Sequence, residues 1–202
     1  MVMASADNIR GMQRVCVFAG SNAGARSVYL TAARELGGEI ARRGHGLVYG
    51  GASVGLMGAC ADAALLAGGE VVGVLPRALT SREIAHQGLT EMRIVGSLHE
   101  RKAVMSALSD AVVALPGGCG TMDELFEAIT WAQLGLHDKP LGLLDAGGYY
   151  APLFRLLRHM EDEGFVRPGL QLVRAGNAAE LLDRLFAAPP VVAGRAGPAP
   201  RP

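Results

Sequence analysis

The chain has 202 residues, of which half are hydrophobic and 28 are glycine. This length fits one domain with a substantial core, since domains commonly have about 100–200 residues. Lys plus Arg equals Asp plus Glu, at 19 each, and aromatic residues make up 5%. A balanced charge creates no net field that would draw the chain to nucleic acid or a membrane surface, and so few aromatics argue against a base-stacking platform. We therefore expect neither nucleic acid nor membrane as a partner.

The three cysteines, Cys16, Cys60 and Cys119, are far apart, odd in number and without a CxxC spacing. This usage is typical of a reduced compartment. The first residues contain no continuous apolar segment of a signal peptide, and no later run approaches about 18 apolar residues. We predict a cytoplasmic protein.

Residues 1–13 lack a periodic pattern and are expected to form a flexible arm, whereas residues 14–187 form the predicted domain. Within that domain, β-type apolar runs predict strands at 14–19, 47–49, 70–75, 92–95, 111–115, 141–144 and an edge strand at 172–173. Helical spacing or turn chemistry predicts helices at 28–43, 54–66, 98–109, from Thr121 onward, 151–163 and 178–186. Residues 77–90 are expected to be a loop with a short helical piece. The Pro-, Ala- and Gly-rich residues 188–202 are a predicted disordered tail.

Strands that alternate with helices predict an α/β fold: a Rossmann-like, doubly wound parallel sheet flanked by helices on both faces. Crossovers in such sheets are right-handed, and ligands lie at the edge where the strands end. That edge should bring together the turns after the strands and the start of the 98–109 helix. We therefore expect Ser21, Gly50, Gly51 and the 116–120 turn to share one rim.

The most informative stretch is DAVVALPGGCGTMDELFE, residues 110–127. It indicates a buried strand, a glycine turn and a helix whose expected N-cap is Thr121, with Asp123 and Glu124 in the first turn. Backbone N–H groups at such a turn form an anion site, and phosphate is the usual occupant. An acid beside a phosphate site repels the phosphate, so Glu124 must have another role.

A second glycine-rich turn, GGASVGLMG at 50–58, is a weaker signal. It does not match GxGxxG, and no GKS or GKT follows a glycine, so a Walker-type site is excluded. Close packing of strand and helix explains these glycines as well as nucleotide binding does.

Arg101 and Lys102 occur near the start of the 98–109 helix, in HERKA. Cations there oppose the helix dipole at a cost of roughly 0.3–1 kcal/mol, which suggests an anionic ligand on the same rim. The alternative is a solvated pair whose partners are Glu100 and Asp110.

Other catalytic patterns are missing from the sequence. The five histidines show no HExxH or other metal-ligand spacing, so no metal site is predicted. No GxSxG elbow exists, and Ser21 or Ser53 without a placed histidine is a poor nucleophile. Cys119 lies in the glycine turn without the following arginine that cysteine phosphatases need, so a turn-filling role is favoured.

Two motifs together carry a resemblance to a known family. PGGCGTMDE (116–124) matches the PGGxGTxxE signature of the Lonely guy (LOG) family, and HERKA (99–103) resembles its second signature. YGGASVGLMG, REIAHQGLTE and TWAQLGLHDKPLGLLDAGGYY are similar to LOG proteins as well, so the likeness covers about residues 14–186. Proteins of this kind have been labelled lysine decarboxylases, but the chain shows no lysine context for pyridoxal phosphate.

The resemblance implies a cytokinin riboside 5′-monophosphate phosphoribohydrolase, which releases an N6-modified adenine and ribose 5-phosphate and needs no cofactor. It implies Arg101 and Glu124 as the catalytic pair. Expected substrate contacts, including those of the shared rim, are Ser21, Gly50, Gly51, Glu83, Lys102, Gly117, Gly118, Cys119, Gly120, Thr121, Met122, Asp123 and Thr130. Ala52 replaces a glycine common in the family, and Cys119 replaces a frequent Tyr or Phe. A non-catalytic nucleotide or cofactor carrier of the same fold is the alternative.

The implied chemistry suits these residues. Cleavage of the C1′–N9 bond builds positive charge on the ribose, which a carboxylate such as Glu124 stabilises while it orients or deprotonates water. Arg101 either neutralises the phosphate or assists the departing purine.

LOG proteins of this length are typically homodimers, and the apolar positions of the two helices that start near the site support the same expectation. On the helix after Thr121 they cover more than one stripe. The alternative is that the last helix, 178–186, covers the surplus.

Overall fold

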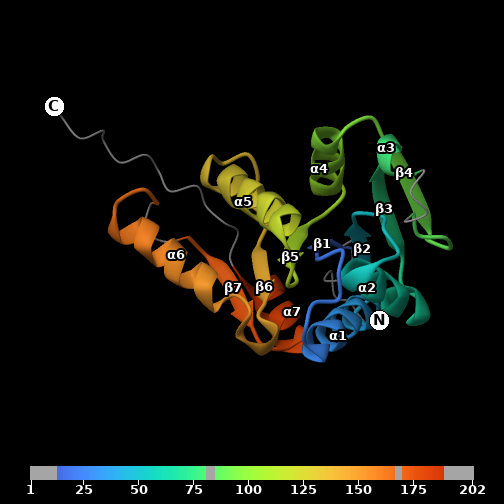
Figure 1. Ribbon diagram of the computed structural model, residues 1–202, viewed down its shortest axis with the longest axis horizontal. Helices are drawn as coiled ribbons and strands as arrows, with labels where there is room; N and C mark the ends of the chain where they lie inside the picture. The colour runs from blue at the N-terminus through green and yellow to red at the C-terminus, as the bar shows by residue number, and fades with distance from the viewer. Residues whose placement is uncertain (1–12, 81–84, 167–169, 189–202) are drawn as a thin grey trace, which may run out of the picture.

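The computed structural model describes residues 13–80, 85–166 and 170–188. Seven parallel strands form one sheet in the order β4-β3-β2-β1-β5-β6-β7 (Figure 1). The strands are β1 (Arg14–Phe18), β2 (Gly46–Tyr49), β3 (Val71–Pro76), β4 (Glu91–Val95), β5 (Ala111–Ala114), β6 (Leu141–Leu144) and β7 (Leu172–Ala175). Every predicted strand is present, and β7 lies at the edge as expected. The predicted α/β class and parallel sheet are confirmed.

Helices cover both faces of the sheet (Figure 1). One face carries α1 (Ser27–Arg42), α2 (Gly55–Leu66) and α7 (Ala178–Ala187). The other carries α4 (Leu98–Ala107), α5 (Cys119–Gln133) and α6 (Ala151–Asp162). Two short pieces, α3 (Arg77–Thr80) and the 3₁₀ turn η1 (Ala146–Gly148), follow β3 and β6. The short helix expected after residue 77 is therefore present. None of the helices in the described ranges has the length and apolarity needed to cross a bilayer.

The central strands have apolar side chains on both faces because helices cover both. Every residue of β2, β3, β5 and β6 is buried, as expected for a parallel sheet packed on two sides. The edge strands β4 and β7 are only partly buried. Continuous apolar runs in the sequence thus correspond to interior strands.

The start of α5 differs from the prediction. The helix begins at Cys119 with Gly118 as its N-cap, so Thr121 is not the cap. Thr121 is buried and packs against Gly117, where a β-carbon would lie 2.1 Å from its Oγ1. The N-cap lies three residues earlier than predicted, which places Asp123 and Glu124 beyond the first turn, in which no acidic residue occurs.

Other termini follow the expected chemistry. Ser97 caps α4 and its Oγ accepts a hydrogen bond from Glu100 N at 3.1 Å. Gly44, with φ of +74°, ends the first helix in the left-handed conformation typical of a terminal glycine. The predicted arm and tail lie outside the described residues except for Gln13 and Ala188.

The turns after β1, β2 and β5 meet at the carboxyl edge of the sheet. Gly20 N donates to Pro116 O at 3.0 Å, and Leu56 N donates to Gly20 O at 2.9 Å. Strand order reverses between β1 and β5, so this edge is the topological switch point at which doubly wound folds bind ligands.

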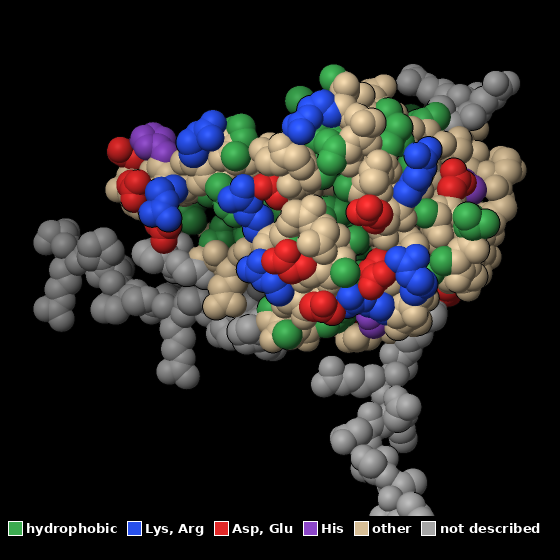
Figure 2. Space-filling model, turned by 90° about the horizontal axis from the view of Figure 1, so that it is seen from below, with side chains coloured by type: hydrophobic (Ala, Val, Ile, Leu, Met, Phe, Trp, Pro, Cys, Tyr) green, Lys and Arg blue, Asp and Glu red, His purple; other side chains and the backbone are tan. Residues whose placement is uncertain are grey.

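Basic and acidic side chains are interspersed on the face shown in Figure 2, without one large area of a single sign. Several of the chain's surface charges form ion pairs, such as Arg43 with Asp183 at 2.7 Å and Arg184 with Glu180 at 3.1 Å. Positive and negative charges therefore balance not only over the whole sequence but also between neighbouring side chains on the surface.

Two adjacent glycines of α1 provide a test of its packing on α2. A methyl group on Gly37 would lie 2.0 Å from the carbonyl oxygen of Cys60, whereas one on Gly38 would meet only the Arg42 guanidinium, at 3.1 Å. Gly37→Ala should lower the free energy of unfolding by about 1–3 kcal/mol, because the helices must separate. Gly38→Ala should raise it by about 0.5–1 kcal/mol, because alanine favours a helix. Urea denaturation measures both, and equal effects would contradict this packing.

Candidate active site

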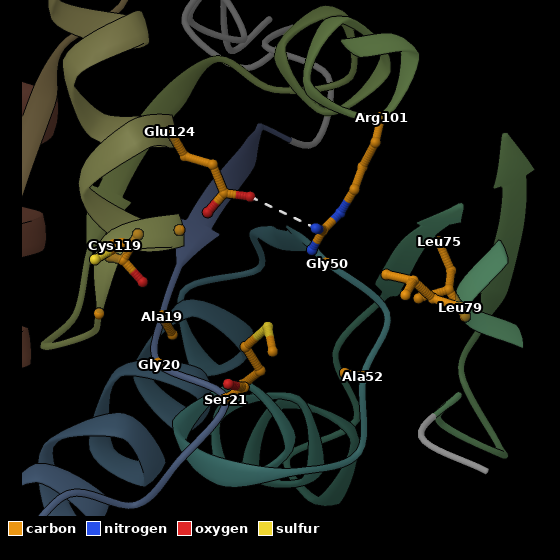
Figure 3. A pocket seen from close by; sticks show the side chains of 14 residues that line it. Ala19, Gly20, Ser21, Gly50, Ala52, Leu75, Leu79, Arg101, Cys119 and Glu124 are labelled. Atoms are coloured by element: carbon orange, nitrogen blue, oxygen red, sulfur yellow. Dashed lines mark ion pairs between the residues drawn. The ribbon is translucent and has the colours of Figure 1, made fainter. Parts of the chain in front are cut away.

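A cavity of about 340 Å³ opens at the switch-point edge (Figure 3). Its walls come from the turns after β1, β2 and β5, from the end of β3 with α3, and from the starts of α4 and α5. The lining residues are Ala19, Gly20, Ser21, Gly50, Ala52, Met57, Leu75, Leu79, Arg101, Gly118, Cys119, Gly120, Thr121 and Glu124. The tertiary structure thus brings residues as far apart in the sequence as Ala19 and Glu124 into one site.

Arg101 and Glu124 face each other across the upper part of this cavity (Figure 3). Nη1 of Arg101 lies 3.8 Å from Oε1 of Glu124, and the two side chains are only 14% and 13% exposed. Nε of Arg101 also donates to the Val74 carbonyl at 3.1 Å, which fixes the guanidinium against β3. The pair therefore combines a held cation and a nearly buried carboxylate at one cavity wall.

Gly50 makes room for the guanidinium of Arg101. A β-carbon at this position would lie 1.7 Å from Nη2 of Arg101 and 3.3 Å from Sδ of Met57. Glycine just after β2 is thus required for the position of Arg101. The sequence suggests two roles for this glycine, close packing of strand and helix or contact with a nucleotide, and the space it leaves for Arg101 is a third.

The environment of Glu124 makes its carboxyl group less acidic. Burial raises its pKa above the ordinary value, the Arg101 guanidinium opposes this shift, and the negative charge of Asp123 adds to it. A carboxylate whose pKa moves toward neutrality is a better proton acceptor at physiological pH.

The start of α5, from Gly118 to Thr121, lines the cavity together with Glu124. The first N–H groups of a helix have no intrahelical acceptor, and Gly118 has no side chain with which to cap α5. Cys119 is exposed at this position and lines the cavity. The geometry suits an anion at the start of α5, beside the buried carboxylate.

Two predicted contacts form a separate ion pair on the flank of the site. Lys102 Nζ lies 3.0 Å from Asp123 and 3.1 Å from Glu127, outside the cavity lining. Burial disfavours the charged ammonium, but hydrogen bonds to both carboxylates outweigh it and raise the pKa of Lys102. Lys102 therefore joins α4 to α5.

The solvated-pair alternative for Arg101 and Lys102 is wrong in its partners. Glu100 accepts a hydrogen bond from Gly96 N, and Asp110 accepts one from Arg14 N. The cations instead pair with carboxylates of α5.

The remaining predicted contacts lie in several places. Gly117 borders a neighbouring hollow, and Gly51 packs against Leu75 with φ of +76°. Met122 is partly buried and packs against the core, and the Thr130 hydroxyl donates to Phe126 O farther along the helix. Glu83 lies outside the described residues. Of the predicted set, Ser21, Gly50, Arg101, Gly118, Cys119, Gly120, Thr121 and Glu124 line the cavity.

The sequence reasoning missed an apolar wall. Met57, Leu75 and Leu79 line the cavity from three different elements. Leu75 and Leu79 lie across the cavity from Cys119 (Figure 3). No periodic pattern links these residues, so only the fold places them together.

Comparisons with known proteins show the family to which the chain belongs. The family model described as "Possible lysine decarboxylase" matches residues 57–185. A probable cytokinin riboside 5′-monophosphate phosphoribohydrolase of Oryza sativa subsp. japonica is 52% identical over 174 residues, covering 85% of this chain and 78% of that protein. A cytokinin riboside 5′-monophosphate phosphoribohydrolase of Arabidopsis thaliana is 48% identical over 181 residues, covering 89% and 79%. The chain belongs to the LOG family.

Solved structures extend the likeness beyond close LOG relatives. The molybdenum cofactor carrier protein from Chlamydomonas reinhardtii is 25% identical, with a TM-score of 0.67 over 88% of this chain and 100% of that one. A molybdenum cofactor binding protein from Rippkaea orientalis gives a TM-score of 0.68 at 23% identity, covering 88% and 98%. The LOG chain thus shares its fold with carrier proteins, while the curated relatives that are about half identical are named as hydrolases.

Gly50→Ala tests the placement of Arg101. The methyl group displaces the flexible end of Arg101, so the fold should persist while kcat/KM for a cytokinin riboside 5′-monophosphate falls about 10²-fold, the size of loss that a small misplacement at an active site can cause. Gly176→Ala is the matched control, because nothing lies within 4 Å of its added carbon. Steady-state kinetics measures the effect, and native activity in Gly50→Ala would contradict the proposed importance of this position.

Proposed function

We propose that this protein is a cytokinin riboside 5′-monophosphate phosphoribohydrolase, which hydrolyses the N-glycosidic bond of adenosine monophosphate and its N6-modified derivatives. The single observation that carries the proposal is the Arg101–Glu124 pair, 3.8 Å apart and nearly buried, in a cavity bordered by the N-terminus of α5. Relatives at 48–52% identity bear the name of this activity.

The cavity suits the three parts of such a nucleotide in order. The N–H groups at the start of α5 would hold the 5′-phosphate. Glu124, one to two turns along the same helix, would lie beside the ribose. The apolar wall of Met57, Leu75 and Leu79 would take the adenine and its N6 substituent. Ala52 and Cys119 also line the cavity, so the two departures from the common family pattern both bear on fit.

The reaction then uses the carboxylate of Glu124. As the C1′–N9 bond breaks, its electron pair leaves with N9 and positive charge develops on the ribose, next to Glu124. Water bonds to C1′ and passes a proton to the carboxylate. The departing purine takes up one proton from solvent, and Glu124 returns its proton to solvent, so the carboxylate is regenerated. Free base and ribose 5-phosphate result. The burial that raises the pKa of Glu124 helps it to accept that proton.

Arg101 would act on the leaving base. Its guanidinium lies between Glu124 and the wall formed by Leu75 and Leu79 (Figure 3), while the start of α5 supplies the phosphate site on the other side of Glu124. A permanently charged donor there stabilises the negative charge that develops on the purine.

A carrier without turnover is less well supported. Carrier proteins share the fold at 25% identity, but the hydrolase relatives have about twice that identity and cover most of the chain. A carrier also has no need for a nearly buried carboxylate beside its anion site, since that charge opposes binding.

The proposal also covers the compartment, the partners and the oligomeric state of the protein. We infer a cytoplasmic protein with no nucleic acid or membrane partner, from the balanced charge and the three free cysteines.

We also infer a homodimer, from apolar side chains near the end of α5. Leu134 and Leu136 are 68% and 67% exposed in the single chain. The alternative that the last helix covers this face is wrong, because α7 packs with α1 on the opposite face of the sheet. A second copy set against α5 by a twofold axis would bury these leucines.

Hydrolysis itself is the first test. Incubation of the protein with adenosine monophosphate or isopentenyladenosine monophosphate should release free base, detected by chromatography, and no base from the corresponding nucleosides. Glu124→Gln should keep nucleotide binding and lower kcat by about 10²–10³-fold, because one electrostatic group is lost at the transition state. Binding without base release in the native protein would favour the carrier, and near-native turnover in Glu124→Gln would remove that residue from the mechanism.

The same variant tests the electrostatics of the site. A folded-state pKa above the ordinary 4.5 means that Glu124 stabilises the fold at low pH and that this contribution is lost as pH rises through the raised pKa. Glu124→Gln should therefore be more stable than the native protein at pH 7, and the difference should vanish below pH 4.5. Native kcat should fall as pH drops through the raised pKa. Thermal melts and pH–rate profiles measure both, and a less stable variant at pH 7 would contradict the sign.

The dimer is tested at its proposed interface. Leu134→Glu should convert the protein from two chains to one in sedimentation at micromolar concentration, because a charge cannot be buried unpaired there. Leu66→Glu is the control, since Leu66 is 92% exposed on the opposite helix layer. A native protein that sediments as one chain would refute the dimer.

A further inference from the structure

The carbonyl groups that lead into the glycine loop accept hydrogen bonds from within the protein. Four successive carbonyls, from Leu115 to Gly118, are engaged in this way. Their donors are Tyr150 OH to Leu115 at 2.6 Å, Gly20 N to Pro116 at 3.0 Å, Tyr149 OH to Gly117 at 2.5 Å and Met122 N to Gly118 at 3.1 Å. A loop whose carbonyls are held elsewhere can present its N–H groups to an anion.

The peptide plane between Gly117 and Gly118 is the part of the loop that can rotate most easily. Neither residue has a side chain that resists rotation of the peptide plane. In a trans peptide the C=O and N–H groups point in opposite directions, so a carbonyl directed to Tyr149 directs the Gly118 N–H the other way. Tyr149 borders the neighbouring hollow, which Gly117 and Gly118 also line, while of these three residues only Gly118 lines the cavity as well. Rotation of this peptide plane would replace the Gly118 N–H at the cavity by the Gly117 carbonyl oxygen, whose partial negative charge repels an anion.

The hydroxyl of Tyr149 is held in place by its surroundings. Its ring lies edge-on to Tyr29 and to Tyr150, with centroids 5.7 and 5.1 Å apart. Tyr150 is in turn fixed by its backbone N–H, which donates to the buried carboxylate of Asp145 at 2.6 Å. Asp145 pairs with Arg174 at 2.5 Å. The donor to Gly117 is therefore built into the η1–α6 junction.

We propose that Tyr149 is a positioning residue for the 5′-phosphate: it holds the Gly117 carbonyl out of the cavity and so keeps the Gly118 N–H directed into it. The identity of the anion rests on the proposed function. Tyr149 acts through the loop and does not reach the sugar or base. The phosphate is bound before and during bond cleavage alike, so the loss should appear in KM and leave kcat nearly unchanged.

Tyr149→Phe removes only the hydroxyl. We expect KM for adenosine monophosphate and the Kd of ribose 5-phosphate, measured by calorimetry, to rise about 10-fold, as the loss of one hydrogen bond to a charged group does. The Kd of adenine and kcat should change by less than about 2-fold. Tyr29→Phe is the matched control, because it removes a neighbouring hydroxyl and retains the bond from Tyr149 to Gly117. Tyr150→Phe should lower the melting temperature without weakening ribose 5-phosphate binding, since Leu115 precedes the glycine turn.

Three results would overturn the proposal: an unchanged Kd for ribose 5-phosphate in Tyr149→Phe, an equal rise in Tyr29→Phe, or a fall in kcat with constant KM. If Tyr149→Phe does not fold, the native protein supplies a second measurement. Its Gly118 amide proton should shift downfield when ribose 5-phosphate is added, and a resonance that stays in place also overturns the proposal. Failure of the native protein to release base would remove the proposed hydrolysis, yet the ribose 5-phosphate measurements would still decide the role of Tyr149.

Discussion

The close approach of three glycine-containing turns is the constraint on which the site depends. Gly20 N reaches Pro116 O at 3.0 Å, and a β-carbon on Gly117 would lie 2.8 Å from that same nitrogen. A β-carbon on Gly55 would lie 2.3 Å from the Ser21 carbonyl carbon. Side chains at these positions would separate the turns after β1, β2 and β5. Because they are absent, three strand ends from distant parts of the chain form one cavity edge.

That compact edge has an electrostatic cost. It holds Glu124 with only 13% of its side chain exposed, and burial of the charged form outweighs the attraction of Arg101. The protein thus keeps a carboxylate where its ionised form is disfavoured, which is common at sites that use such a group in chemistry. The guanidinium that partly offsets this cost is itself held by the Val74 carbonyl and by the space over Gly50.

Neighbouring cations on α4 have different roles because consecutive helical residues point in different directions. Arg101 enters the cavity, whereas Lys102 turns toward Asp123 and Glu127 of α5. The local rule that cations disfavour a helix N-terminus correctly indicated that both need anionic partners. It contains no information on direction, so a substrate role for Lys102 and its interhelical pairing were equally compatible with it.

The sequence by itself determined the α/β class, all seven strands and the strand–glycine–helix segment, because apolar runs, helical spacing and glycine turns are local signals that the parallel sheet reinforces. The rim that unites Ser21, Gly50 and the 116–120 turn also followed, since the carboxyl ends of parallel strands share an edge. Only the tertiary structure decided the start of α5 at Cys119, the apolar wall of Met57, Leu75 and Leu79, and the pairing of Lys102. It also placed Tyr149 against Gly117. At the start of α5 the contact is short in sequence, between Gly117 and Thr121, but the other features arise from contacts between residues far apart in the chain. Neither propensity nor periodicity encodes which distant side chain will occupy a given space.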